Sequence, residues 1–189
     1  IKLLSTNKNV NKIINQAKEF KNKDIIISDY NKFLFAKKKY KRLNINFHNS
    51  LLYLDRILHK HKIFYSMISI MGLDGLSPAL KLIKHSKNIA VVNKESLICG
   101  WNLIKKELKK YKTNFIPIDS EHFSISEILK NSNSALIEKI YITASGGPFL
   151  NFSKSKLSKV SVRDALKHPN WKMGKKISID SATMMNKVF

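Results

Sequence analysis

Short apolar runs alternate with amphipathic stretches over the first 118 residues, and this alternation limits the chain to few folds. The apolar runs are continuous, as in "DIIIS" at 24–28 and "NIAVV" at 88–92. Strands with continuous apolar runs are buried on both faces, which is typical of parallel sheets covered by their crossover helices. We therefore predict an α/β fold, a parallel sheet with helices on both faces.

The same pattern gives the expected elements. Strands are predicted at 1–5, 24–28, 43–47, 63–70, 88–92, 114–118 and 140–144. Helices are predicted at 9–20, 30–40, 51–61, 77–85 and 94–111, with Ser77 as N-cap and Pro78 at the first helical position of the fourth. After residue 120 the pattern changes. A long irregular segment follows "SGGPF" at 145–149, and order resumes at 177–187 as a strand and a helix start.

Polar clusters follow three of the expected strands. "NKES" at 93–96 comes after "IAVV", "DSEH" at 119–122 after "FIPI", and "SGGPF" after "KIYITA". Ligands of parallel sheets bind beyond the carboxyl ends of the strands. These clusters are therefore expected to converge on one crevice.

Asp119 and Glu121 are the candidate metal ligands. In extended chain, residues i and i+2 face the same side, so the two carboxylates would lie together. A divalent cation relieves their repulsion, and oxygen ligands suit Mg²⁺ or Mn²⁺. The alternative is a solvated turn in which Asp or Ser caps the next helix.

Other residues could bind an anion or cover a ligand. Lys94 opens a helix directly after a buried strand, and Ser145 precedes two glycines whose backbone can approach an anion. His168 could donate to an anion or carry a proton. Trp171 and Met173 would line a lid, unless Trp171 only anchors its loop to the core. A hydroxyl, an amide and an ammonium group suit a phosphate: Ser181, Asn186 and Lys187.

Composition restricts the class of protein. No apolar run is long enough for a membrane span, no signal peptide is visible, and the single cysteine, Cys99, excludes an internal disulfide framework. These features indicate a cytoplasmic protein without a membrane partner.

The formal charge of +22 would suit nucleic-acid binding. However, the basic residues are almost all lysines spread along the chain, with arginine only at 42, 56 and 163, and base readers favour arginine. We read the charge as compositional drift and predict no nucleic-acid partner. A basic nucleic-acid-binding protein without catalysis remains the alternative.

Taken together, these motifs resemble the 1-deoxy-D-xylulose-5-phosphate reductoisomerase family of the non-mevalonate isoprenoid pathway. The match comprises "NKES", "PIDSEH" at 117–122, "SGGPF" and, most specifically, "HPNWKMGKKISIDSATMMNK" at 168–187. The resemblance implies a Rossmann-like NADPH-binding domain at 1–118 and the start of an α+β catalytic domain with a flexible lid at 119–189. It also implies an oxidoreductase that isomerises and reduces 1-deoxy-D-xylulose 5-phosphate to 2-C-methyl-D-erythritol 4-phosphate, using NADPH and Mg²⁺ or Mn²⁺. The block argues against a different metal-dependent dehydrogenase on the same fold.

Matching positions carry the family's site residues onto this chain. The metal ligands are Asp119 and Glu121, and the catalytic set adds Lys94 and His168. The substrate contacts are Lys94, Ser120, Glu121, Ser145, His168, Trp171, Met173, Ser181, Asn186 and Lys187. The NADPH contacts are Asn7, Lys8, Asn9, Asn93, Glu95 and Gly174, although the family commonly has glycine at position 7.

The resemblance also defines what this sequence lacks. The family's first strand, its glycine-rich G-x-T-G-S-I-G loop, a third metal carboxylate shortly after "MMNK" and the C-terminal domain are expected outside the 189 residues, and Val188 stands where glycine is usual. We therefore expect a fragment that is inactive alone, from a full-length protein that forms a homodimer and acts on a small sugar phosphate.

Overall fold

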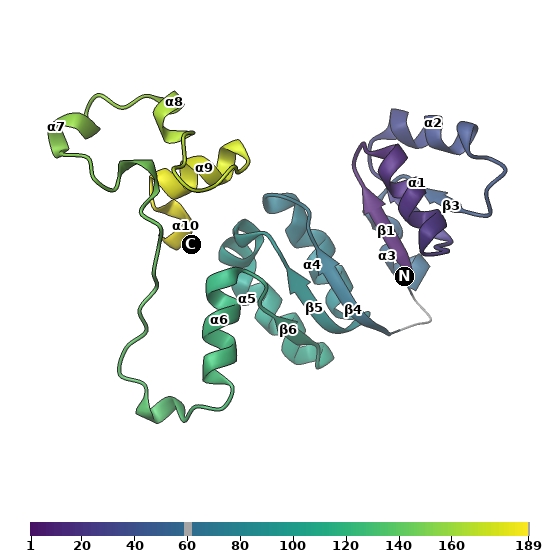
Figure 1. Ribbon diagram of the computed structural model, residues 1–189. Helices are drawn as coiled ribbons and strands as arrows, with labels where there is room; N and C mark the ends of the chain where they lie inside the picture. The colour runs from purple at the N-terminus through teal and green to yellow at the C-terminus, as the bar shows by residue number, and fades with distance from the viewer. Residues whose placement is uncertain (59–61, 189) are drawn as a thin grey trace. The chain divides into compact units, whose positions relative to one another are not determined.

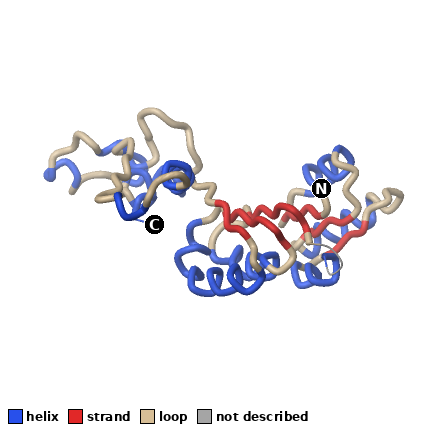
Figure 2. Tube along the Cα trace, turned by 90° about the horizontal axis from the view of Figure 1, so that it is seen from below, coloured by secondary structure: helices blue, strands red, loops and turns tan. Residues whose placement is uncertain are grey.

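The computed structural model describes residues 1–58 and 62–188 and divides the chain into two compact units, 1–118 and 119–189 (Figure 1). The NADPH-binding and catalytic roles expected for these two parts stay predictions. The first unit contains every strand of the described residues, whereas the second is built of short helices joined by long loops (Figure 2).

The first unit follows the expected alternation. Its strands are β1 (Leu3–Thr6), β2 (Asp24–Ile27), β3 (Asn46–His48), β4 (Ile63–Ile68), β5 (Ser86–Val91) and β6 (Asn114–Ile116). Its helices are α1 (Val10–Glu19), α2 (Tyr30–Lys39), α3 (Leu54–Leu58), α4 (Leu76–Ile83) and α5 (Lys94–Tyr111), with 3₁₀ turns η1 (Leu51–Tyr53) and η2 (Leu73–Gly75).

The strands form two parallel three-stranded sheets, in the orders β1-β2-β3 and β4-β5-β6. The registers pair Ile25 with Leu4 and Phe47 in the first sheet, and Ile89 with Ser66 and Phe115 in the second. The α/β class and the parallel pairing are confirmed. The single sheet suggested by the pattern is divided, because β1 and β4 do not pair with each other among the described strands.

Alternating residues of β2 supply both faces of the first sheet. Ile25 and Ile27 pack on one face with Ile13 and Ile14 of α1, while Ile26 packs on the other with two leucines of α3. All are almost completely buried. Side chains of a strand alternate between faces, so a continuous run of isoleucines is what two covered faces require.

The second sheet has its own core. Ile89 and Val91 of β5 pack with Ile83 of α4 and Ile104 of α5. The helix predicted at 94–111 matches α5, and Asn93 is its N-cap, accepting a hydrogen bond from the Ser96 amide at 2.8 Å.

Two predicted helices begin differently in the structure. Ser77 is not an N-cap, because α4 begins at Leu76 directly after η2 and Gly75 holds the cap position. Pro78 still falls among the first amides of the helix, which have no intrahelical acceptor, so its missing N–H costs nothing there. The helix predicted over 51–61 is η1 followed by α3, and its last three positions lie outside the described residues.

The second unit departs from its predicted pattern. Its elements are α6 (Ser120–Leu129), η3 (Ser134–Leu136), η4 (Gly147–Phe149), α7 (Lys154–Leu157), α8 (Val162–Ala165), α9 (Lys175–Ala182) and α10 (Met185–Val188). The strand predicted at 140–144 does not form. Its side chains are exposed, Tyr141 by 81%, and no strand of the described residues pairs with it. A segment rich in strand-forming residues does not form a stable strand unless another strand pairs with it.

The strand expected at the start of 177–187 is also wrong, because these residues lie in α9. The alternation of isoleucine with polar residues suggested a period of two. The buried positions are instead Ser178, Ser181 and Ala182, the i, i+3, i+4 spacing of a helix, while Ile177 is half exposed. Small polar residues, and not the isoleucines, face the interior here.

None of the helices in the part of the chain that the structure describes is long and apolar enough to cross a membrane.

Candidate functional site

The carboxyl ends of β1 and β2 carry the first three predicted cofactor residues. Asn9 is the N-cap of α1 and accepts from the Lys12 amide at 3.1 Å. Lys8 lies 3.9 Å from Asp29, the N-cap of α2, measured from ammonium nitrogen to carboxylate oxygen, and Asn7 accepts from the Asp29 amide at 3.2 Å. An exposed ammonium beside a helix N-terminus can receive an anionic group.

The carboxyl ends of β4 and β5 hold the second cluster. The Asn93 side-chain amide donates to the Ile70 carbonyl at 2.6 Å, and the Ser96 hydroxyl donates to the Gly72 carbonyl at 3.1 Å. These bonds fix the start of α5, where Lys94 and Glu95 occupy the first two helical positions. A Cβ on Gly75 would lie 2.4 Å from the Asn93 amide nitrogen, so this close approach requires glycine.

The two predicted metal carboxylates lie at the start of α6 and not on an extended strand. Asp119 is the N-cap position of that helix, and Glu121 is in its first turn. The i, i+2 argument for a common side is therefore wrong, because the chain turns helical at Ser120. The Asp119 side chain does not cap the helix; its Oδ1 lies 3.0 Å from Nδ1 of His122.

Glu121 joins two distant parts of the sequence. Its Oε1 forms an ion pair with the Lys187 ammonium group, and its Oε2 accepts from the Ser120 hydroxyl at 2.9 Å. Both partners of the ion pair are largely buried, with side chains 26% and 16% exposed. The "DSEH" motif and the "MMNK" motif therefore meet in the second unit, and a shared site for them stays a prediction.

His168 has a defined protonation pattern. Its Nδ1 accepts from the backbone amides of Asn170 and Trp171, both at 3.1 Å. Since an acceptor nitrogen carries no proton, the ring proton is on Nε2, which donates to the Ser145 hydroxyl at 3.1 Å. The Ser145 hydroxyl then has its own proton available for a further acceptor, such as an anionic oxygen.

The two glycines after Ser145 are required by the backbone. Gly146 and Gly147 both adopt positive φ, 83° and 64°. A Cβ on Gly147 would lie 2.8 Å from the Ser181 carbonyl oxygen. The "SGGPF" turn therefore packs directly on the buried end of α9, which brings the segments of Ser145 and Ser181 together.

The remaining predicted residues lie around α9 and α10. Trp171 is 62% exposed and is not an anchor in the core, Met173 is partly buried, and Gly174 is the N-cap of α9 with open space around it. Asn186 and Lys187 follow Met184, whose φ of 61° turns the chain between the two helices. A non-glycine residue with positive φ is a strained position that often marks a functional site.

Two residues of these clusters were missing from the predicted set. His122 contacts Asp119, and its place inside "DSEH" was the available signal. Asp29 contacts Lys8, and its signal was an acidic N-cap at a strand's carboxyl end.

The donor set fits a divalent cation in part. Asp119 and Glu121 are hard oxygen donors of the kind that suit Mg²⁺ or Mn²⁺, and one oxygen of Glu121 is paired with the Lys187 ammonium group. Over residues 1–58 and 62–188 no group of three or more His, Cys, Asp or Glu side chains is placed to hold a metal. The metal-ligand role of these two carboxylates stays a prediction.

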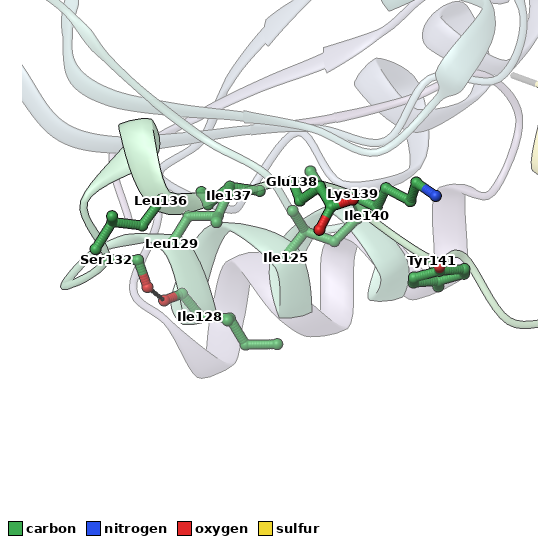
Figure 3. A pocket seen from close by; sticks show the side chains of 10 residues that line it. All are labelled: Ile125, Ile128, Leu129, Ser132, Leu136, Ile137, Glu138, Lys139, Ile140 and Tyr141. Carbon is green, nitrogen blue, oxygen red and sulfur yellow. Dashed lines mark hydrogen bonds between the residues drawn. The ribbon is translucent and has the colours of Figure 1, made fainter.

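A cavity of 560 Å³ in the second unit lies apart from these residues. It is lined by one face of α6, including Ile125 and Ile128, and by the segment that follows, up to Tyr141 (Figure 3). None of its lining residues belongs to the predicted site, and it adds nothing to the chemistry described above.

Comparison with family models gives two matches. Residues 1–100 match the model described as 1-deoxy-D-xylulose 5-phosphate reductoisomerase. Residues 115–189 match the model described as 1-deoxy-D-xylulose 5-phosphate reductoisomerase C-terminal domain.

Similar proteins carry the same name. The chain is 58% identical to the 1-deoxy-D-xylulose 5-phosphate reductoisomerase of Pelagibacter ubique, and the match covers 100% of this chain and 49% of that protein. It is 43% identical to the enzyme of the same name from Clostridium tetani, covering 97% of this chain and 48% of that protein. The chain thus spans about half the length of these relatives.

Solved structures of proteins with this name are similar to this chain in fold. A structure described as 1-deoxy-D-xylulose 5-phosphate reductoisomerase from Zymomonas mobilis in complex with NADPH superposes with a TM-score of 0.86 and 32% identity, covering 98% of this chain and 48% of that one. A second structure is described as DOX-P reductoisomerase in complex with NADPH, fosmidomycin and magnesium. It superposes with a TM-score of 0.81 and 35% sequence identity, covering 99% of this chain and 48% of that one.

Proposed function

This chain belongs to the 1-deoxy-D-xylulose 5-phosphate reductoisomerase family, and on that premise we propose that the full-length protein is an NADPH- and divalent-metal-dependent reductoisomerase. It would rearrange the skeleton of 1-deoxy-D-xylulose 5-phosphate and reduce the resulting aldehyde to 2-C-methyl-D-erythritol 4-phosphate, in the non-mevalonate route to isoprenoids. The observation that carries the proposal is the ion pair between Glu121 and Lys187, which unites a carboxylate motif with an anion-binding motif 66 residues away.

Asp119 and Glu121 are the proposed metal ligands. A bound Mg²⁺ or Mn²⁺ would supply positive charge to the substrate oxygens on which negative charge develops. In this proposal His122 positions the Asp119 carboxylate through its 3.0 Å contact. Ser120 and Lys187 contact Glu121 and hold it in the same way.

The substrate phosphate is proposed to bind to hydroxyl, amide and ammonium donors of the second unit. Ser145 can donate because His168 already supplies the proton that the serine oxygen accepts. Ser181, Asn186 and Lys187 provide the other donors, and charge-assisted bonds from an ammonium group are the strongest of these. Lys94, at the first turn of α5, would stabilise developing negative charge on the substrate.

NADPH is proposed to bind at the carboxyl ends of the strands in the first unit, where it would supply the hydride. Its contacts there would be Asn7, Lys8, Asn9, Asn93 and Glu95, and the family resemblance predicts Gly174 as a further contact. Lys8 is suited to a phosphate because it is exposed and lies near the start of α1. One similar solved structure holds NADPH, and another holds NADPH, fosmidomycin and magnesium.

Trp171 and Met173 are proposed to cover the substrate. An exposed indole in a loop without regular structure has an apolar face to place over a ligand, and closure would exclude water from a reactive intermediate. We further propose a cytoplasmic homodimer whose partner is the sugar phosphate and not a nucleic acid.

The test is NADPH oxidation, followed spectrophotometrically with substrate and Mg²⁺. Because the chain spans half of its relatives, the assay uses the full-length gene product alongside the 189-residue chain. We expect turnover in the full-length protein and none in the chain alone. A folded full-length protein that fails to oxidise NADPH with this substrate would contradict the proposal.

Nucleic-acid binding is the competing function, favoured by the charge of +22. It predicts DNA affinity that falls steeply with salt and does not change in Asp119→Ala. The enzyme proposal predicts instead that the protein lacks this salt-dependent DNA affinity and that Asp119→Ala removes activity and spares the fold.

A further inference from the structure

The edge strand β3 borders a groove that the proposed function does not use. β3 is an edge strand, paired with β2 alone among the described strands. The groove of 850 Å³ beside it is walled by Phe33 and Lys37 of α2 and by Tyr53 and Arg56 of η1 and α3. We call it the edge groove. It is an open groove at the surface and not an enclosed cavity.

The charge in the edge groove is positive. Three of its lining side chains are cations: Lys37, Lys41 and Arg56. The single carboxylate in the lining is Asp24, whose Oδ1 already accepts from the Asn46 side-chain amide at 3.1 Å and contacts Nε2 of His48 at 3.2 Å. With three cations against one carboxylate, the lining is positive on balance.

Apolar and aromatic side chains adjoin these cations. The Lys37 ammonium nitrogen lies 5.9 Å from the centre of the Phe33 ring, and the rings of Tyr53 and His48 lie 6.0 Å apart. Tyr53 is 40% exposed, so its ring is accessible from the groove. A ligand that fills the groove therefore meets positive charge beside flat apolar surface.

We propose that the edge groove binds a small aromatic anion, an aryl phosphate or an aryl carboxylate. The anionic group would pair with Lys37 and Lys41, and the ring would lie against Phe33 and Tyr53. None of the proposed NADPH, metal or substrate residues lines this groove. The proposal is therefore independent of the proposed function and would stand if that function failed.

The experiment titrates the chain, labelled with ¹⁵N, with phenyl phosphate and follows amide and side-chain NMR signals. Saturable shifts are expected at Asn46, Phe47 and Tyr53, whereas inorganic phosphate should bind more weakly and phenol should not shift these signals. The double variant K37E/K41E should weaken phenyl phosphate binding about tenfold or more, because two attractive charges become repulsive. The neutral variant K37Q/K41Q should give an intermediate loss.

The matched control is K38E/R42E, which changes the net charge equally with the same i, i+4 spacing on side chains that do not line the groove. It should change the affinity less than twofold. An equal loss in both variants would overturn the proposal, since it would reflect general charge attraction. Absence of shifts in the groove would overturn it too. So would displacement of phenyl phosphate by NADPH, because the groove would then be part of the cofactor site.

Discussion

The two units of this chain bury their residues in opposite ways. In the first unit, β2 places three consecutive isoleucines in two cores, one on each face of the sheet. In the second unit, the described helices bury small and polar positions such as Ser178 and Ser181, while isoleucines at 140, 142 and 177 are exposed. The first unit is held by periodic apolar packing and the second by turns, close backbone approaches and ion pairs.

This difference matches where the candidate site residues lie. A periodic core fixes the strands and leaves the candidate residues at their carboxyl ends, as with Lys8 after β1 and Lys94 at the start of α5. The second unit has less periodic core to maintain, so its polar residues contact each other directly, as Glu121 and Lys187 do. The unit with weaker patterning therefore has the denser set of candidate site residues.

The largest effect is expected on activity in the second unit. Asp119→Asn in the full-length protein should lower turnover by about 10³-fold, because the proposed metal loses a charged ligand. The free energy of unfolding should change little, since the Asp119 side chain does not cap α6. Steady-state NADPH oxidation measures the effect, and Glu127→Gln on the same helix is the control, with near-normal turnover expected. Equal losses of turnover in the two variants would contradict the proposed role of Asp119 as a metal ligand.

The next largest effect is expected on stability, when an isoleucine is replaced by alanine in each unit. Ile89→Ala in β5 should cost about 2–5 kcal/mol of unfolding free energy, because a fully buried side chain leaves a cavity. Ile142→Ala should cost less than about 0.5 kcal/mol, since that side chain is 53% exposed. Urea unfolding followed by circular dichroism decides the comparison. Similar costs at the two positions would show that the units do not differ as described.

A backbone effect of intermediate size is expected where the second unit relies on glycine. Gly147→Ala should destabilise by about 1–3 kcal/mol, because the residue has positive φ and its new Cβ would press on the Ser181 carbonyl. Gly174→Ala is the matched control, with ordinary φ and open space around it, and should change stability little. Thermal unfolding of both variants tests this, and a neutral Gly147→Ala would contradict the packing of the turn on α9.

The smallest effect is a pH dependence in the first unit. The Lys84 ammonium group, followed by His85, holds the pKa of the Asp55 carboxyl below its ordinary value. A lowered folded pKa means that the stabilisation is present above the unfolded pKa of about 3.9 and is lost as the pH falls below it.

The test is Asp55→Asn, unfolded in urea between pH 7 and pH 2.5. At pH 7 the variant should be less stable by under about 1 kcal/mol, since the carboxylate is nearly half exposed. The difference should shrink at the acid end. A difference that grows as the pH falls would contradict the assignment.

The fold of the first unit could be predicted from the sequence because its signals are local. Apolar runs, helical spacing and the N-cap Asn93 each depend on neighbours within a few residues, and they located six strands and the helix α5. The start of α4 was misplaced at Ser77, since the preceding 3₁₀ turn extends the helix backwards and no local residue signals it.

The predictions failed where a strand or helix depends on a partner far along the chain. The segment 140–144 has strand-forming residues, yet a strand exists only when another strand accepts its hydrogen bonds. At 177–180 isoleucine alternates with polar residues in the sequence, but α9 buries Ser178, Ser181 and Ala182, and the backbone at Ser181 and Ala182 lies against Gly147 of "SGGPF". Which face is buried is a property of the neighbouring segment, and the sequence pattern alone does not contain it.

For the site, the sequence by itself determined the residue types and the motifs: two carboxylates, a glycine pair after Ser145, and a block of donors from His168 to Lys187. Only the tertiary structure decided which of them touch. It paired Glu121 with Lys187, set the His168 proton toward Ser145, and turned Asp119 toward His122 instead of along a strand with Glu121. The physical reason is range. Propensity and periodicity act over one or two turns, whereas an ion pair 66 residues apart in the chain forms only after the intervening backbone has folded.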